Sequence, residues 1–340
     1  MPTPITDVRE ISRIAYGFMG SKALFSALNF DIFGRLVGGH KTFENLVKEI
    51  GVAPNRLRTV LAALTALGLI VRDGEGYGNA PASERYLVRG APAYFGDYYR
   101  FQIDRQLYPA LVHLDSGIAG DTAHLAFDSF AGLTDDPEEA DAFTRAQHSG
   151  SMGPALMLAK NFSLKGARTL LDVGGGSGAF SIALCQRNPE LRTTVLDFPN
   201  VIDVAERFVK EAKLQDRIGL LRGDAISAAW PSGQDVVLMS YLLSAVAEAS
   251  FPLLFRKAWE ALDPGGRLLI HDFMLRDDET GPTEAALFFL HYLSYRVDGI
   301  SFSAATLAPQ LASIGFRGIS DEVVIPSITK LVVCTKPQGQ

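Results

Sequence analysis

The sequence has few residues that could cross-link the chain or bind a metal ion. Its 340 residues include two cysteines and six histidines. Cys185 and Cys334 both fall inside apolar segments, which favours reduced, packed thiols over a disulfide. We find no spacing of Cys and His typical of a zinc site, so we expect no metal. Reduced thiols also make a cytoplasmic location the default expectation.

Strong positive charge and long apolar runs are also missing. The formal net charge is -6 at pH 7 and no run of Lys and Arg occurs, so we expect no nucleic-acid partner. No apolar run approaches the roughly 20 residues that a membrane-spanning helix needs, and we expect neither a secretory signal nor a membrane partner. With 47% hydrophobic residues, the chain can nevertheless bury a sizeable core, in two or three structural units.

One stretch organises the chain: a buried-strand pattern over 169–173 that runs into a turn containing Gly174, Gly176 and Gly178. Glycines let the backbone turn sharply and approach a ligand, which predicts a nucleotide-like cofactor here. Gly174, Gly176 and Ala179 also satisfy a relaxed dinucleotide fingerprint. However, Asp172 stands just before the glycines, and a carboxylate repels phosphate. It favours a cationic ligand without phosphate, and S-adenosylmethionine is the common one.

Further acids follow the next strand patterns. Asp197 ends the second strand, where a ribose needs a hydrogen-bond acceptor, and Phe198, which follows it, is also expected to contact the cofactor. Asp224 and Ala225 follow the third strand and are expected beside the adenine. The remaining strand patterns, which end in an antiparallel hairpin, lie at 235–239, 267–270, 323–325 and 331–334. Together they predict an α/β fold: a doubly wound, Rossmann-like sheet of the methyltransferase type.

The amino-terminal region has a different pattern. Apolar residues at helical spacing, followed by a hairpin signal, predict helices and a hairpin over 8–28, 30–36, 42–50, 54–67 and 69–77. Three helices and a hairpin make a winged helix, which raises a DNA-binding alternative with Arg56 and Arg58 as the readers. The negative net charge argues against that alternative.

A segment rich in aromatic residues and methionine, 92–162, connects the two regions as a predicted helical bridge. Core packing explains most of these side chains. We expect His148, Ser149 and Met152 nearest the cofactor, because their helix leads directly into the glycine turn, and His148 is a candidate for substrate binding.

Four motifs together resemble those of the acetylserotonin/caffeic-acid O-methyltransferase-like family. They are residues 171–178, 196–199, 223–224 and 264–266. The resemblance covers nearly the whole chain. It implies three domains, namely a winged-helix dimerisation domain (1–91) that forms a homodimer, the bridge (92–162) lining the active site, and an S-adenosylmethionine-binding domain (163–340).

The same resemblance implies roles for individual residues. Asp172 and the three glycines would hold the amino-acid end of S-adenosylmethionine. Asp197 would bind the ribose, and Asp224 with Ala225 the adenine.

The chain departs from this family where the catalytic base is expected. In the O-methylating members a histidine follows the strand that begins at Asp235, and alignment puts Ser244 at that position. A basic residue that often lies against the adenine is replaced by Ser240, which we expect to contact the cofactor, and the adjacent Tyr241 is expected at the substrate. Since serine cannot deprotonate a hydroxyl at neutral pH, three explanations stay open. The acceptor needs no deprotonation, another residue is the base, or no methyl group is transferred.

A helical pattern over 285–296 offers a second base, His291. The resemblance implies that this helix lines the acceptor pocket, with Tyr292 and Arg296 along an adjacent edge. Arg296, if it faces the pocket, implies a carboxylate-bearing acceptor; the alternative is a surface ion pair with Asp298. His271 and Asp272 end the fifth strand at the carboxyl edge of the sheet, where Asp272 can approach the acceptor.

The sequence therefore predicts an S-adenosylmethionine-dependent methyltransferase acting on a small molecule. The missing histidine favours a sulfur or carbon acceptor, for example a methylthio-hydroxy acid. One alternative is an O-methyltransferase of an aromatic metabolite that uses His291 as its base. Others are a non-methylating enzyme that retains the cofactor and a winged-helix DNA-binding regulator.

Overall fold

The chain divides into two compact units, residues 3–108 and the residues from 109 onward. The computed structural model describes residues 3–74, 76–121, 130–294, 296, 300–326 and 328–339. The predicted helical bridge contributes to both units. The domain boundaries at 91/92 and 162/163 stay predictions.

The amino-terminal unit consists of helices and a three-stranded antiparallel sheet of order β1-β3-β2. Its elements are α1 (Val8–Asn29), α2 (Ile32–Arg35), β1 (Lys41–Thr42), α3 (Phe43–Ile50), α4 (Pro54–Ala66), β2 (Ile70–Asp73), β3 (Gly76–Asn79), α5 (Pro81–Tyr86) and a π-helix, η1 (Tyr98–Leu107). As expected, the Thr42 hydroxyl caps α3 by accepting from the Asn45 N–H, at 3.3 Å. The winged-helix prediction is confirmed.

Helices α6 to α9 open the second unit. Their bounds are α6 (Tyr108–Ala110), η2 (Leu111–His113), α7 (Leu114–Ile118), α8 (Phe130–Thr134) and α9 (Pro137–Asn161). Asp136 caps α9, since its side chain accepts from the N–H groups of Glu138 and Glu139. The long helix α9 ends shortly before the central sheet begins.

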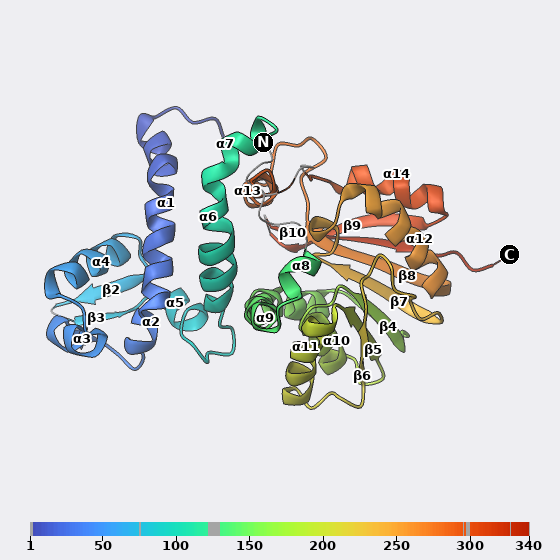
Figure 1. The fold of residues 1–340 in the computed structure, drawn as a ribbon, viewed down its shortest axis with the longest axis horizontal. Coiled ribbons are helices and arrows are strands. Elements are labelled where there is room, and N and C mark those ends of the chain that lie inside the picture. Colours follow the sequence, from blue (N-terminus) through green and yellow to red (C-terminus); the bar gives the residue numbers. More distant parts are fainter. Residues whose placement is uncertain are drawn as a thin grey trace. The chain divides into compact units, whose positions relative to one another are not determined.

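A seven-stranded sheet of order β6-β5-β4-β7-β8-β10-β9 forms the centre of this unit (Figure 1). The strands are β4 (Thr169–Val173), β5 (Arg192–Asp197), β6 (Ile218–Arg222), β7 (Gln234–Ser240), β8 (Leu262–Phe273), β9 (Arg317–Ile325) and β10 (Thr329–Thr335). Strands β4 to β8 are parallel, whereas β10 lies antiparallel between β8 and β9. The doubly wound sheet with a closing hairpin is confirmed.

Helices cover both faces of this sheet. They are α10 (Ala179–Arg187), α11 (Pro199–Glu211), η3 (Leu243–Ala245), η4 (Glu248–Ser250), α12 (Phe251–Ala261), α13 (Thr283–Tyr292) and α14 (Ala304–Ile314). Alternate residues of β4 enter opposite cores. Leu171 packs in the cluster that includes α12 and α14, and Leu170 packs in the one that includes α9 and α10. The carboxyl ends of the parallel strands therefore meet at one edge, where a ligand binds in such folds.

Several elements differ from the predictions. Strand β9 begins at Arg317, six residues before the predicted start at Val323. Strand β8 begins at Leu262, five residues before the predicted start at Arg267, because Leu262 pairs with Gln234 before a register shift in the ladder. Helix α13 ends at Tyr292, so Ser294 lies in a turn beyond the helix. Among the described helices, none combines the length and the apolar character that a bilayer crossing requires.

Candidate active site

The glycine turn after β4 has the backbone that the sequence predicts. Gly174, Gly176 and Gly178 have φ angles of 64°, 57° and 75°, a region that other residues rarely adopt. The Gly174 N–H donates to the Leu196 carbonyl at 2.8 Å, which fixes the turn against the end of β5. A Cβ at Gly176 would meet no atom within 4 Å. The turn therefore presents an open backbone at Gly176, at the carboxyl edge of the sheet.

Asp172 lies buried beneath this turn. Its Oδ2 accepts from the Ser181 hydroxyl at 2.8 Å, and its Oδ1 has no partner among the described residues. Burial, opposed by the Ser181 bond and reinforced by the charge of Asp197, raises the pKa of Asp172 to about 7. An unpaired buried carboxylate oxygen is costly, and a donor with positive charge removes that cost. The ammonium group of S-adenosylmethionine is such a donor.

Asp197 joins the turn to the next strand. Its Oδ2 accepts from the Gly176 N–H at 2.7 Å, and its Oδ1 accepts from the Phe198 N–H at 2.8 Å. Burial raises the pKa of Asp197 to about 6, against these two hydrogen bonds. Each oxygen keeps a second lone pair, so the carboxylate can still accept from the hydroxyls of a ribose.

The loop after β6, residues 224–230, holds the third predicted acid. Asp224 Oδ1 accepts from the Ile226 N–H at 2.9 Å, and Oδ2 accepts from the Ser227 hydroxyl at 3.1 Å. The Ala225 carbonyl accepts from the Trp230 indole at 3.0 Å and from Lys257 Nζ at 3.0 Å. The sequence predictions include Asp224 and Ala225 but not Lys257, which reaches the loop from α12.

His148 supports the glycine turn from α9. Its Nδ1 and the Ser177 hydroxyl lie 2.8 Å apart in a hydrogen bond, and its ring stacks on Phe208 with centroids 3.7 Å apart. Burial lowers the pKa of His148 to about 4, so the ring is neutral near pH 7. His148 thus contacts the glycine turn through Ser177. Its predicted proximity to the cofactor and its role toward substrate stay predictions.

Tyr241 follows the last residue of β7 and has a positive φ of 56°. Such a conformation is rare for an aromatic residue and is typical of functional sites. The Ser240 hydroxyl lies 2.9 Å from His271 Nδ1, and His271 Nε2 lies 2.9 Å from the Thr329 hydroxyl. Burial lowers the pKa of His271 to about 3. His271 is thus a neutral residue of the core, and the cofactor contact predicted for Ser240 stays untested.

Asp272 is directed at the loop that follows β7. Its Oδ2 accepts from the Ser244 N–H at 3.1 Å, and its Oδ1 accepts from the Phe273 N–H at 2.8 Å. Burial, opposed by these bonds, raises the pKa of Asp272 to about 7. The same loop places Leu242 where a side chain at Gly174 would stand, 2.9 Å from its Cβ position. Asp272 therefore fixes the loop that carries Ser244, and the substitution of Ser244 for a catalytic histidine stays a prediction.

Helix α13 supplies His291 and Tyr292, whereas Arg296, predicted on the same helix, lies beyond its end at Tyr292. His291 is buried, and its Nδ1–H donates to the Phe288 carbonyl, which leaves the lone pair of the ring on Nε2. Burial lowers the pKa of His291 to about 4, with a smaller effect of the same sign from Arg296. Arg296 donates to the Ser244 carbonyl at 3.4 Å, and its guanidinium lies 5.4 Å from the Tyr292 ring centroid. The proposed ion pair with Asp298 lies outside the described residues.

Aromatic rings connect the loop after β7 with α13. Tyr241 contacts Phe273 with centroids 5.4 Å apart, and Phe273 stacks on Phe288 at 3.6 Å and 16°. Phe288 then contacts His291 and Tyr292 at 4.7 and 5.6 Å. We call these five residues the aromatic wall. The sequence predictions include neither Phe273 nor Phe288, although the four-residue spacing of Phe288 and Tyr292 on a helix is a usable signal.

Comparison with known proteins identifies the family. Residues 116–317 match the O-methyltransferase domain, and residues 12–89 match the O-methyltransferase dimerisation domain. The chain belongs to the O-methyltransferase family. As an enzyme of this family it is an S-adenosylmethionine-dependent methyltransferase, which confirms the predicted family, fold class and cofactor. Within the described residues, no group of three or more His, Cys, Asp or Glu side chains is arranged to hold a metal ion.

Two relatives and one solved structure illustrate the match. The tetracenomycin polyketide synthesis 8-O-methyl transferase TcmO of Streptomyces glaucescens is 30% identical over 99% of this chain and 100% of its own length. The 3-hydroxy-5-methyl-1-naphthoate 3-O-methyltransferase of Streptomyces sahachiroi is 30% identical over 86% and 83% of the two chains. Human N-acetylserotonin methyltransferase, in complex with S-adenosylmethionine, shares the fold with a TM-score of 0.88 at 22% identity, covering 99% of this chain and 100% of that one.

The pKa of Asp172 predicts how binding of S-adenosylhomocysteine depends on pH. Since burial raises that pKa to about 7, the carboxyl must lose a proton before it can pair with the ligand ammonium. The affinity is therefore expected to rise from about pH 5.5 to about pH 7.5, and calorimetric titration measures it.

Asp172→Asn removes this charge and serves as the control. We expect an affinity lower by about tenfold or more and a weaker pH dependence, with Asp197 responsible for what remains. A wild-type affinity that is constant over this range contradicts the role of Asp172.

Proposed function

We propose that this enzyme methylates a hydroxyl group on an aromatic small molecule with fused or extended rings. The observation that supports the proposal most directly is the aromatic wall, since flat rings of this kind stack on a planar acceptor. The two relatives named above are an 8-O-methyl transferase of polyketide synthesis and a naphthoate 3-O-methyltransferase, and both names agree with such an acceptor.

Bound S-adenosylmethionine supplies a methyl group that its positive sulfur already activates. The residues of this chain hold it in place. Asp172 pairs with the ammonium, the bare backbone of the glycine turn admits the amino-acid end, and Asp197 accepts from the ribose. Asp224 and Ala225 lie beside the adenine. Alignment and exclusion of water are then the main contributions of the protein.

His291 removes the proton of the acceptor hydroxyl in this proposal. The Phe288 carbonyl holds the ring in the tautomer whose Nε2 is the basic nitrogen. With a pKa of about 4, His291 is a weak base that is unprotonated near pH 7. It therefore suits a hydroxyl made acidic by electron-withdrawing groups on the ring. The positive charge of Arg296, near the His291 ring, stabilises the resulting oxyanion.

The sulfur or carbon acceptor expected from the sequence stays a prediction. A sulfur or carbon acceptor, such as a methylthio-hydroxy acid, needs no base and would leave His291 without a chemical role. The cytoplasmic location also stays a prediction; Cys185 and Cys334 are both free, buried thiols.

Replacing His291 tests the acceptor atom. With a panel of hydroxynaphthoates and hydroxyanthraquinones, His291→Ala is expected to lower kcat by about 100-fold or more, the usual contribution of a general base. Affinity for S-adenosylhomocysteine should not change. Formation of S-adenosylhomocysteine measures turnover, and His40→Ala, an exposed histidine of the other unit, is the control. Unchanged turnover in His291→Ala, or turnover of methylthio acids alone, contradicts the proposal.

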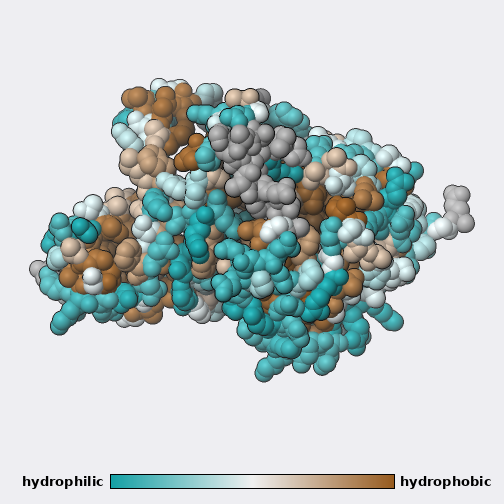
Figure 2. All heavy atoms as spheres, in the orientation of Figure 1, coloured by the Kyte–Doolittle hydropathy of each residue, from teal (hydrophilic) through white to brown (hydrophobic). Residues whose placement is uncertain are grey.

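A homodimer formed through the amino-terminal unit is the second part of the proposal. Residues 12–89 match a dimerisation domain, and helix α1 lies largely within them. Ile11, Ile14 and Phe18, at spacings of three and four residues, share one face of α1 and are 57%, 70% and 53% exposed. Figure 2 shows apolar residues gathered at the amino-terminal end of this helix. A face of this kind favours a protein partner.

Charged residues on this face test the dimer. The wild type is expected to have twice the mass of its 36.8 kDa chain in size-exclusion chromatography with light scattering. Ile14→Asp combined with Phe18→Asp should give a monomer, because two carboxylates cannot be buried without partners. Val112→Asp, at a position that is 77% exposed and outside the matched segment, should leave the dimer intact. A double variant that remains dimeric contradicts this interface.

A further inference from the structure

The ammonium group of Lys257 donates all of its hydrogen bonds to one loop, residues 224–230. From α12, its Nζ donates to the carbonyls of Ala225, Ile226 and Ala228 at 3.0, 2.8 and 2.6 Å. An ammonium has three hydrogens, so each has an acceptor in the same loop. Nζ also lies 5.3 Å from the ring centroid of Trp230. These contacts hold the Lys257 side chain in place, and they also hold the backbone of the 224–230 loop.

Residues of the loop also make hydrogen bonds with one another. Asp224 accepts from the Ile226 N–H and the Ser227 hydroxyl, and the Trp230 indole donates to the Ala225 carbonyl. The Gly223 N–H donates to the Asp197 carbonyl at 2.9 Å, which connects the loop to the end of β5. Without Lys257, three carbonyls lose a charged donor at once. The segment 225–228 then keeps its bonds to Asp224 and to the Trp230 indole, but the described carbonyls of Ile226 and Ala228 lose their charged donor.

We infer that Lys257 is a positioning residue for the cofactor: it sets the 224–230 loop so that Asp224 and Ala225 meet the adenine. The inference rests on the proposed place of the adenine at this loop. Lys257 acts through the backbone and takes no part in the transfer of the methyl group. Its loss should therefore weaken cofactor binding.

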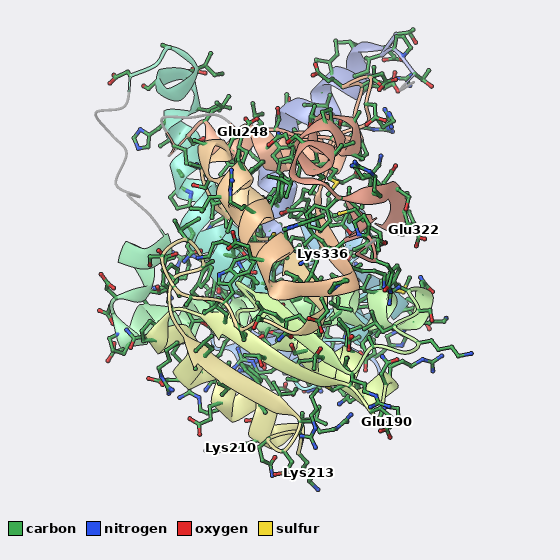
Figure 3. The ribbon with its side chains drawn as sticks, turned by 90° about the vertical axis from the view of Figure 1, so that its right-hand side faces the viewer. Glu190, Lys210, Lys213, Glu248, Glu322 and Lys336 are labelled. Carbon is green, nitrogen blue, oxygen red and sulfur yellow. The ribbon has the colours of Figure 1, made fainter. Side chains whose placement is uncertain are left out.

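A second lysine makes the same contacts elsewhere. Lys336 Nζ donates to the carbonyls of Trp259 and Leu262 at 2.7 and 2.6 Å, and it lies 5.3 Å from the ring centroid of Trp259. Lys336 follows β10 beside the start of β8, at the end of the sheet opposite the carboxyl edge (Figure 3). The two lysines resemble each other in donors, carbonyl acceptors and tryptophan contact, but only Lys257 holds the 224–230 loop. Lys336 is the matched control.

The experiment compares Lys257→Met with Lys336→Met. Methionine keeps much of the apolar stem and removes the ammonium, so both variants should lose thermal stability. Calorimetric titration with S-adenosylhomocysteine should give a Kd raised by about tenfold or more in Lys257→Met and changed by less than about twofold in Lys336→Met. Lys257→Arg should give an intermediate Kd, because a planar guanidinium cannot direct three N–H groups at three converging carbonyls. Lys257→Arg also tests the role of Lys257 if Lys257→Met does not fold.

The possible outcomes distinguish a failure of the role of Lys257 from a failure of the proposed cofactor site. Equal Kd values for the Lys257 and Lys336 variants, with tight binding by the wild type, overturn the role of Lys257 alone. No binding of S-adenosylhomocysteine by the wild type overturns the cofactor site and the role of Lys257 together. A raised Kd confined to the Lys257 variants supports the inference, since a general loss of stability would affect both lysine positions alike.

Discussion

A buried carboxylate without a full set of hydrogen bonds is the constraint on which this site depends. Asp172 lies under the glycine turn with one oxygen bonded to Ser181 and the other without a described partner. Burial raises the pKa of Asp172 to about 7, because its surroundings stabilise the charge of the carboxylate poorly. In the proposed site, the ammonium of the methyl donor pairs with this carboxylate and removes that cost.

The fold brings the other parts of the site to the same edge. Parallel strands β4 to β8 place Asp172, Asp197, Asp224, Tyr241 and Asp272 at or after their carboxyl ends. Asp197, Asp224 and Asp272 also accept hydrogen bonds from backbone or hydroxyl groups of adjoining loops, whereas Asp172 accepts from Ser181 in α10. Asp272 holds the loop that carries Ser244. In our proposal the general base is His291 on α13.

Much of this could be predicted because it depends on local sequence. The pattern over 169–173 predicts a strand and β4 has the same bounds, since a buried parallel strand is a short apolar run. The glycines after it follow from the turn that they must make. By contrast, Pro264 and the two glycines after it resemble a turn, yet pairing between Leu262 and Gln234 extends β8 across them. Lys257 could not be predicted, because its acceptors lie 29 to 32 residues away in the sequence.

A crystal structure with S-adenosylhomocysteine tests the central claim most directly. We expect the ammonium of the ligand within hydrogen-bond distance of Asp172 Oδ1, and its sulfur directed toward the aromatic wall. A ligand whose amino-acid end lies away from Asp172, with that oxygen still unpaired, would contradict the claim that this carboxylate holds the methyl donor.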